Sequence, residues 1–543
     1  MTKPDGVPSS KALRAIRENL AAFALIFTAL FLAHAPLLRL PYFWDEAGYF
    51  IPAARDLLLT GALIPHSTLS NAHPPLLMLW LAFWWKFSAY TPAVTRFAML
   101  LIAAFALLGL WRLARAVANS QVAIATVICT ALYPVFFAQS SLAHLDMLAA
   151  AFTLWGLAMY VERRPVSALV FFALAPIAKE TALIAPLAIC AWELFCTLLR
   201  SRMGAGSSLC LRSGTPTRAL VWLLCALPLL CWLAYHEHVT GYVFGNPEYL
   251  RYNGTATLNP LRVVLALLIR LWHLLGYLNL FVLTLGAAYA MFMPPLLERN
   301  GSERPRIPIN VQLVFAVVIL AYLVAFSVVG GALLARYLLP VYPLIILVCV
   351  STLRRRVHRW TWWVVAACIL FVFNLCIPPP YRIAPEDTLL YRDYVIEHKA
   401  AANMLSAHFA NKRVLTAWPA SDELTRPYLG YVKQPLQVVR IENFSDLEML
   451  RASHATDQFD VVFLFSTKWE PPHPLLGSLP FGRALHERFF DYHEDMDPQR
   501  AAALLGGRVL DYQNRDNEWI AIIGIERVEN ASLAGGIRSL GSH

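Results

Sequence analysis

Charged residues are scarce in this chain. Of its 543 residues, 58% are hydrophobic and only 15% are Asp, Glu, Lys or Arg. Soluble globular proteins carry about 45–50% apolar and about 25% charged residues, so this composition excludes an ordinary soluble globular protein. Acidic residues are the rarest, since the first 380 residues contain 13 Asp and Glu against 28 Lys and Arg. Each carboxylate in that part can therefore be considered individually.

The sequence also lacks the common motifs of metal-binding, disulfide-bonded and nucleotide-binding proteins. No two of the nine cysteines form a CxxC pair, and eight of them lie in apolar runs. They are therefore expected to be small buried hydrophobic residues, with neither a disulfide framework nor a zinc site. The sequence contains no GxGxxG motif, no P-loop and no internal repeat, which removes the usual indications of a nucleotide-binding domain.

The net charge of +10 is unevenly distributed, because residues 381–543 hold 17 Lys and Arg and 22 Asp and Glu. The basic residues of the remaining chain lie between apolar runs rather than on one soluble face. They therefore indicate membrane topology, and we expect no nucleic-acid partner.

Long apolar runs recur up to about residue 377 and then stop. A helix needs about 20 apolar residues to span a bilayer. We therefore predict a mainly α, polytopic membrane protein with about 11 to 13 spans and a C-terminal soluble α/β domain. The predicted spans are 19–40, 93–115, 121–138, 147–161, 166–178 with 181–199, 219–236, 274–296, 311–330, 335–353 and 360–377.

The basic loops fix a topology, because Lys/Arg-rich loops stay cytoplasmic. With the N-terminus inside, five of them fall on the same side, and the loops 41–92, 139–146, 237–262 and 331–336 fall outside with the tail. The start of the chain also resembles a signal peptide, with Ala33-His34-Ala35 as a cleavage site, but the apolar run is long and Pro36 follows, which favours an uncleaved helix. We expect an integral protein of a bacterial inner (plasma) membrane. Its predicted parts are a cytoplasmic tail (1–18), a membrane domain (19–380) and an extracytoplasmic domain (381–543).

The extracytoplasmic tail alternates strand-like and helical patterns, which is typical of a small α/β domain. The expected strands are Arg413–Trp418, Leu436–Ile441, Phe459–Ser466 and Trp519–Ile525, and the expected helices are Glu386–Phe409, Asp446–Ala452 and Pro498–Leu505.

The first external loop opens with PYFWDEAGYF, which places Asp45 and Glu46 where an apolar run ends. Such a pair is commonly a solvated helix cap. In a chain that otherwise avoids carboxylates, an ionisable group at the membrane face is instead a functional candidate. Ala53–Leu59 and Pro75–Phe87 of the same loop have the spacing of interfacial helices.

Other ionisable residues fall on the same outer face. His73 precedes two prolines, His144 and Asp146 lie in the short second external loop, Lys179 pairs with Glu180 between two apolar halves, and Arg336 opens a helix. Each has an ordinary alternative: a structural loop histidine, a helix cap, a local ion pair, or snorkelling to lipid. Arg251, Arg262 and Arg270 are, like Arg336, candidates for binding a phosphate, but weaker ones. Together, carboxylates and cations at a lipid–water boundary suit a reaction in which a lipid phosphate leaves.

These motifs carry a resemblance. WDEAGYF…AARDLLLTGALIP, HPPLL, HLDM, AKE and RYLLPVYP, within about residues 20–350, resemble those of polytopic GT-C glycosyltransferases. The nearest groups are the protein O-mannosyltransferases, the lipid A aminoarabinose transferases and the lipopolysaccharide-core galacturonosyltransferase type. The resemblance implies transfer of a sugar from a polyprenyl-phosphate donor, with inversion, to a protein, lipid A or surface-glycan acceptor. It implies Asp45 as the base and Lys179 and Arg336 as phosphate ligands; His73 departs from the acidic-basic pair of the aminoarabinose enzymes.

We therefore predict a membrane glycosyltransferase, and the alternatives are a transporter or flippase for lipid-linked sugars and an inactive scaffold. A divalent metal ion is left open, and membrane lipids are further expected partners. The predicted catalytic residues are Asp45, Glu46 and Asp146, and the predicted donor-phosphate ligands are His73, Lys179 and Arg336.

Overall fold

The computed structural model describes residues 10–203, 211, 216–247, 259–329, 331–471, 480–490 and 492–526. The chain forms two compact units. The first comprises the residues up to Val395 together with Lys468–Tyr492, and the second comprises Ile396–Thr467 and the residues from His493 onward. The domain boundary at residue 381 stays a prediction. All six predicted site residues lie in the first unit.

The first unit is helical, as predicted. Its helices are α1 (Ser10–His34), α2 (Ile51–Thr60), α3 (Leu76–Phe87), α4 (Pro92–Val117), α5 (Ser120–Leu132), α6 (Pro134–Ser141), α7 (Leu145–Val161), α8 (Pro165–Ala178), α9 (Ile184–Met203), α10 (Pro216–Leu220), α11 (Leu227–Thr240), α13 (Pro260–Leu275), α14 (Phe281–Ala290), α15 (Ile309–Val328), α16 (Tyr342–Arg356), α17 (Trp360–Cys376) and α21 (Pro480–Phe489). Helix α18 (Leu390–His408) begins in this unit.

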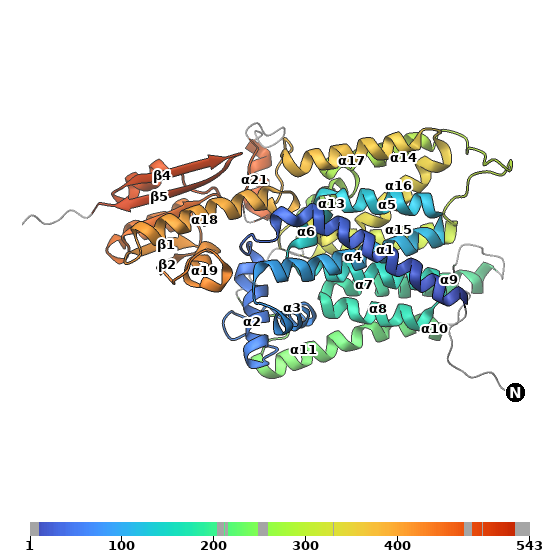
Figure 1. Ribbon diagram of the computed structural model, residues 1–543, viewed down its shortest axis with the longest axis horizontal. Helices are drawn as coiled ribbons and strands as arrows, with labels where there is room; N and C mark the ends of the chain where they lie inside the picture. Colours follow the sequence, from blue (N-terminus) through green and yellow to red (C-terminus); the bar gives the residue numbers. More distant parts are fainter. Residues whose placement is uncertain are drawn as a thin grey trace, which may run out of the picture. The chain divides into compact units, whose positions relative to one another are not determined.

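Six helical segments of the described residues are long and apolar enough to cross a membrane, or seven if the bent pair α5 and α6 is one span. Helices α3, α7, α8, α14 and α17 are apolar but shorter. Helix α7 packs between α4 and α8 (Figure 1). Close approach is possible because small residues lie in α7: Gly156 faces the ring of Phe172 in α8.

Two breaks in the bundle bring polar groups to helix ends. Helices α5 and α6 meet at a bend of 69°, where Pro134 lacks the amide hydrogen that a continuous helix needs. Helix α8 ends at Ala178, and Lys179 is extended (φ −155°, ψ 129°) before the short 3-10 helix η3 (Glu180–Leu183) leads into α9. The predicted break between 166–178 and 181–199 is therefore confirmed, although Glu180–Leu199 is long and apolar enough to span a membrane by itself.

The predicted span over 274–296 was wrong. We expected a helix over 274–296, but α13 ends at Leu275 and α14 covers only Phe281–Ala290. Leu278 and Asn279 between them have positive φ values of 49° and 66°, a conformation that ends a helix. The apolar run continues across this break, so hydropathy alone could not locate it.

The expectation for the cysteines was also wrong in part. Cys196 is disulfide-bonded, and Cys231 and Cys376 are exposed rather than buried. A disulfide requires the two Cα atoms to approach within about 7 Å, and sequence spacing does not reveal such an approach.

The second unit contains a five-stranded sheet in the order β2-β1-β3-β5-β4. The strands are β1 (Arg413–Ala417), β2 (Gln437–Ile441), β3 (Val461–Phe465), β4 (Gly507–Arg515) and β5 (Glu518–Ile525). The first three are parallel and the last two form an antiparallel hairpin. Four strands were predicted. Strand β4 was not, because its residues alternate between half-buried and exposed and lack an apolar run. Helices α19 (Ala420–Thr425), α20 (Asp446–Ser453) and α22 (Pro498–Leu505) complete the unit.

Candidate active site

Asp45 lies at a strained turn in the first loop. The preceding residue, Trp44, has φ 42°, and a π-helix, η2 (Glu46–Phe50), follows directly and leads into α2. Positive φ at a bulky residue and π-helical turns both occur preferentially at functional sites. The side chain of Asp45 is 31% exposed and forms an ion pair with Arg336. It is thus an accessible carboxylate on a rigid turn.

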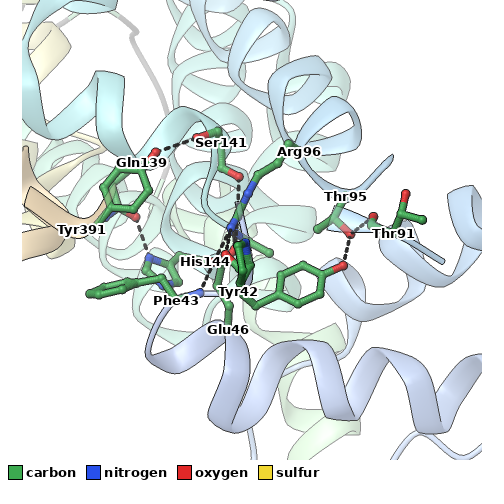
Figure 2. Close-up of polar contacts among 12 residues, drawn as sticks. Tyr42, Phe43, Glu46, Thr91, Thr95, Arg96, Gln139, Ser141, His144 and Tyr391 are labelled. Atoms are coloured by element: carbon green, nitrogen blue, oxygen red, sulfur yellow. Dashed lines mark hydrogen bonds and ion pairs between the residues drawn. The ribbon is translucent and has the colours of Figure 1, made fainter. Parts of the chain in front are cut away.

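Glu46 has a different environment, although it is the next residue. Its side chain is fully buried and forms a two-pronged ion pair with Arg96 of α4. It also accepts a hydrogen bond from the backbone amide of Phe43 at 2.9 Å (Figure 2). A further hydrogen bond comes from the backbone amide of Ala143 at 2.5 Å. Arg96 in turn donates to the carbonyl oxygens of Ser141 and Pro41. Glu46 therefore ties together the first loop, α4 and the turn before α7.

Arg336 connects several of the predicted residues. It lies in the 3-10 helix η6 (Ala335–Leu338), and its side chain is only 5% exposed. Besides the contact with Asp45, its Nε lies 3.7 Å from Oδ2 of Asp146, at the start of α7. The other oxygen of Asp146 accepts a 2.6 Å hydrogen bond from Nζ of Lys179. Asp45, Asp146, Lys179 and Arg336 thus converge from four separate segments.

A third carboxylate, which the sequence analysis missed, completes this cluster. Glu386 lies in the 3-10 helix η7 (Pro385–Asp387), after the last apolar helix, and its Oε1 is 3.2 Å from Nε of Arg336. Burial raises the pKa of Glu386 to about 8, against the opposing effect of Arg336. A usable signal existed: Glu386 is the first carboxylate after α17, only ten residues from its end, and so close to the membrane face.

His144 also contacts Arg336. Its Nδ1 lies 2.6 Å from an Arg336 nitrogen and 2.8 Å from Oε1 of Gln139. Burial, reinforced by the charge of Arg336, lowers the pKa of His144 well below its usual value. The imidazole is therefore neutral at physiological pH, and it orients Arg336 without adding charge.

Three cationic side chains lie near the ring of Tyr337. Lys179 Nζ lies 4.1 Å from its centroid, and the guanidinium carbons of Arg270 and Arg336 lie at 5.6 and 5.8 Å. Arg270, on α13, is buried, and its hydrogen-bond partner is the carbonyl oxygen of Leu334 at 2.5 Å. Arg262 on the same helix is likewise buried, near the carbonyl oxygens of Ser327 and Gly331. Arg251 lies outside the described residues.

His73 belongs to an adjoining cluster. Its Nδ1 lies 3.1 Å from Oε2 of Glu180, and its ring packs against Tyr49 and Phe50 of η2. Ala72, before it, has φ 58°. The two clusters are joined through the chain, because Glu180 directly follows Lys179.

Within the described residues, no group of three or more His, Cys, Asp and Glu side chains is arranged to hold a metal ion. Where three carboxylates do converge, the positive charge between them is the guanidinium of Arg336. The sequence leaves a divalent ion open, and the proposed mechanism does not depend on one.

Comparison with known proteins defines the class of the fold. No protein-family model and no curated protein sequence matches this chain. Among solved structures, it is similar to ArnT from Cupriavidus metallidurans in the apo state, with 13% identity and a TM-score of 0.50 over 95% of this chain and 98% of that one. ArnT from the same organism bound to undecaprenyl phosphate has 13% identity and a TM-score of 0.49 over 97% of this chain and 100% of that one. AglB from Archaeoglobus fulgidus, in complex with an inhibitory peptide and a dolichol-phosphate, has 11% identity and a TM-score of 0.44 over 82% of this chain and 69% of that one.

The similarity to the apo ArnT structure covers almost the whole of both chains. This chain therefore has the GT-C glycosyltransferase fold, a polytopic helical membrane domain with a small C-terminal sheet. At 13% identity the similarity concerns the fold, so its chemistry must be argued from the chain's own residues.

Proposed function

We propose that this protein is a membrane glycosyltransferase that moves a sugar from a polyprenyl-phosphate donor to an acceptor at the outer face of the membrane. The observation that carries the proposal is one cluster: the accessible carboxylate of Asp45 lies against Arg336, which shares Asp146 with the second buried cation, Lys179. Buried cations that converge beside a carboxylate suit a phosphate that leaves while an acceptor loses a proton.

In this mechanism the donor phosphate binds to Arg336 and Lys179 and takes over Arg336 from Asp45. The carboxylate of Asp45 is then free to accept the proton of an acceptor hydroxyl or amine. The acceptor atom forms a bond to the anomeric carbon as the bond from that carbon to the phosphate oxygen breaks. The electron pair leaves with the phosphate, whose added charge the two cations stabilise. A single displacement of this kind inverts the anomeric carbon.

The other residues of the cluster support this arrangement. Asp146 fixes Lys179 through the 2.6 Å contact, and Arg270 adds a third cation beside Tyr337. Glu46, predicted as catalytic, acts in this proposal as a positioning residue, because its oxygens are all committed to Arg96 and two backbone amides. His73 lies with Glu180, at the edge of the phosphate site.

The proposal is tested with purified full-length protein in liposomes that contain a polyprenyl-phosphate sugar with a radiolabelled sugar. We expect the label to leave the lipid and free polyprenyl phosphate to accumulate when an acceptor extract is added. Movement of intact labelled lipid across the bilayer without cleavage would contradict the proposal and would favour a transporter or flippase.

A further inference from the structure

The guanidinium group of Arg336 has more acidic neighbours than it can neutralise. Asp45 contacts one of its terminal nitrogens, while Asp146 and Glu386 lie 3.7 and 3.2 Å from Nε. Lys179 is the second cation that forms an ion pair with these carboxylates, so two paired cations serve three carboxylates. Burial of an unbalanced charge is expensive, and a buried group commonly takes up a proton instead.

The three carboxylates differ in their own partners. Asp146 has a 2.6 Å hydrogen bond from Lys179, and Asp45 reaches the surface with 31% of its side chain exposed. Glu386 has neither: its side chain is 7% exposed, and Oε1 accepts no hydrogen bond from the described residues. Glu386 is therefore the carboxylate whose charge is least stabilised.

The backbone around Glu386 is held independently of its side chain. Gln139 of α6 donates a hydrogen bond to the carbonyl oxygen of Glu386 at 3.1 Å. The neighbouring Asp387 accepts a 2.6 Å hydrogen bond from the hydroxyl of Tyr277. The side chain of Glu386 can therefore gain or lose a proton beside Arg336 while η7 keeps its place.

We propose that Glu386 is a positioning residue that controls how strongly Arg336 binds the donor phosphate. When Glu386 is neutral, Nε and the positive charge of Arg336 are available to the phosphate. When Glu386 is ionised, it competes with the phosphate for the same guanidinium and repels it. This inference rests on the proposed function, since it concerns the same phosphate site.

The sign of the pH dependence follows from the burial of Glu386, which raises its pKa to about 8. Glu386 is mostly neutral at pH 7 and mostly ionised at pH 9, so donor binding weakens as the pH rises. Burial raises the pKa of Asp387 only to about 6, and the second pKa of a phosphate monoester is also about 6. Both lie below this range. The charged or titratable groups that face Glu386, directly or through Arg336, are Asp45, Asp146, Lys179, Arg336, Asp387 and His144.

The test measures the binding of a polyprenyl phosphate to the full-length protein in nanodiscs between pH 7 and pH 9. For the wild type we expect Kd to rise about tenfold over this range, because with a pKa of about 8 the neutral fraction of Glu386 falls about tenfold between pH 7 and pH 9. Glu386→Gln keeps the size of the side chain without the titration, so its Kd should stay low and constant. Glu303→Gln is the matched control: Glu303 is also ion-paired to an arginine, Arg355, but lies in a basic loop with 58% of its side chain exposed. This variant should retain the wild-type profile.

The possible failures are distinguishable. A constant Kd in the wild type, or the same tenfold rise in Glu386→Gln as in the wild type, would overturn the role of Glu386. If Glu386→Gln does not fold, the wild-type profile alone decides. Absence of binding by the wild type at every pH would instead overturn the proposed function, and with it the inference.

Discussion

Asp45 and Glu46 are adjacent in the sequence but are held in opposite ways. Asp45 is partly exposed and has one cationic partner that also serves two other carboxylates. Glu46 is buried and accepts four hydrogen bonds, two from Arg96 and two from backbone amides. A base must exchange partners during a reaction, whereas a structural carboxylate must keep them. This difference supports the proposal, in which Asp45 has the chemical role and Glu46 the structural role.

Arg336→Lys should impair donor use although it preserves the charge. A lysine ammonium is a point charge and cannot reproduce the planar fork that contacts Asp45 and His144 at once. Loss of one charge-assisted hydrogen bond is worth about 1.5–3 kcal/mol, so kcat/KM for the donor should fall roughly 10- to 150-fold. Steady-state kinetics with varied donor checks this. Arg355→Lys in the last turn of α16 is the control, and an equal loss there would contradict a specific role for Arg336.

At this scale the sequence predicted most of the cluster. Asp45, Asp146, Lys179 and Arg336 were selected because charged residues are scarce on the predicted outer face, and the structure brings all four together. Glu386 was missed because it lies in a segment richer in acidic residues, where scarcity no longer singles out a carboxylate. The sequence also could not predict that Asp45 and Glu46 have different environments, because the ion pair that buries Glu46 is made with Arg96, 50 residues away in the sequence.

Among the structural elements, the contact between η2 and α4 positions the site. Glu46 begins η2, and Arg96 lies in the first turns of α4. The hydroxyl of Tyr42 adds a 2.8 Å hydrogen bond to Thr95 of the same helix (Figure 2). The turn that carries Asp45 is thereby fixed to the helical bundle.

Glu46→Ala should therefore destabilise the fold, because it leaves the guanidinium of Arg96 buried and unpaired. Removal of one member of a buried ion pair costs about 3–5 kcal/mol. Chemical or thermal unfolding in detergent measures the loss. Glu18→Ala is the control, since Glu18 pairs with Arg14 on an exposed surface and such pairs contribute about 0–1 kcal/mol. Equal effects in the two variants would contradict the structural role of Glu46.

The helix breaks show where sequence reasoning succeeded and where it failed. Lys179-Glu180 interrupts an apolar run, and the charge itself marked the end of α8. No charge marks the break at Leu278 and Asn279, where positive φ values separate α13 from α14. Such conformations depend on packing, here including the 2.8 Å hydrogen bond from the Leu278 amide to the hydroxyl of Tyr381.

For the whole molecule, the distribution of basic loops predicts on which side of the membrane each part lies. An epitope tag inserted at Gly301, between α14 and α15, should be protected from antibody in intact spheroplasts. A tag inserted at the Asp516-Asn517 turn between β4 and β5 should be accessible. Permeabilised spheroplasts are the control for both tags. Accessibility of the Gly301 tag in intact spheroplasts would reverse the topology and remove the site from the outer face.

The central claim is that Asp45 accepts a proton while a lipid phosphate leaves. It is tested most directly by the rate of sugar transfer from a polyprenyl-phosphate donor by Asp45→Asn, compared with the wild type and with Asp446→Asn. Asp446 is also paired to an arginine, Arg500, but it is 63% exposed and lies in the second unit. General-base catalysis contributes about 10²- to 10⁴-fold to the rate, so kcat of Asp45→Asn should fall at least about 100-fold. This variant should still bind polyprenyl phosphate. Asp446→Asn should match the wild type in both measurements. Transfer by Asp45→Asn at the wild-type rate would contradict the account.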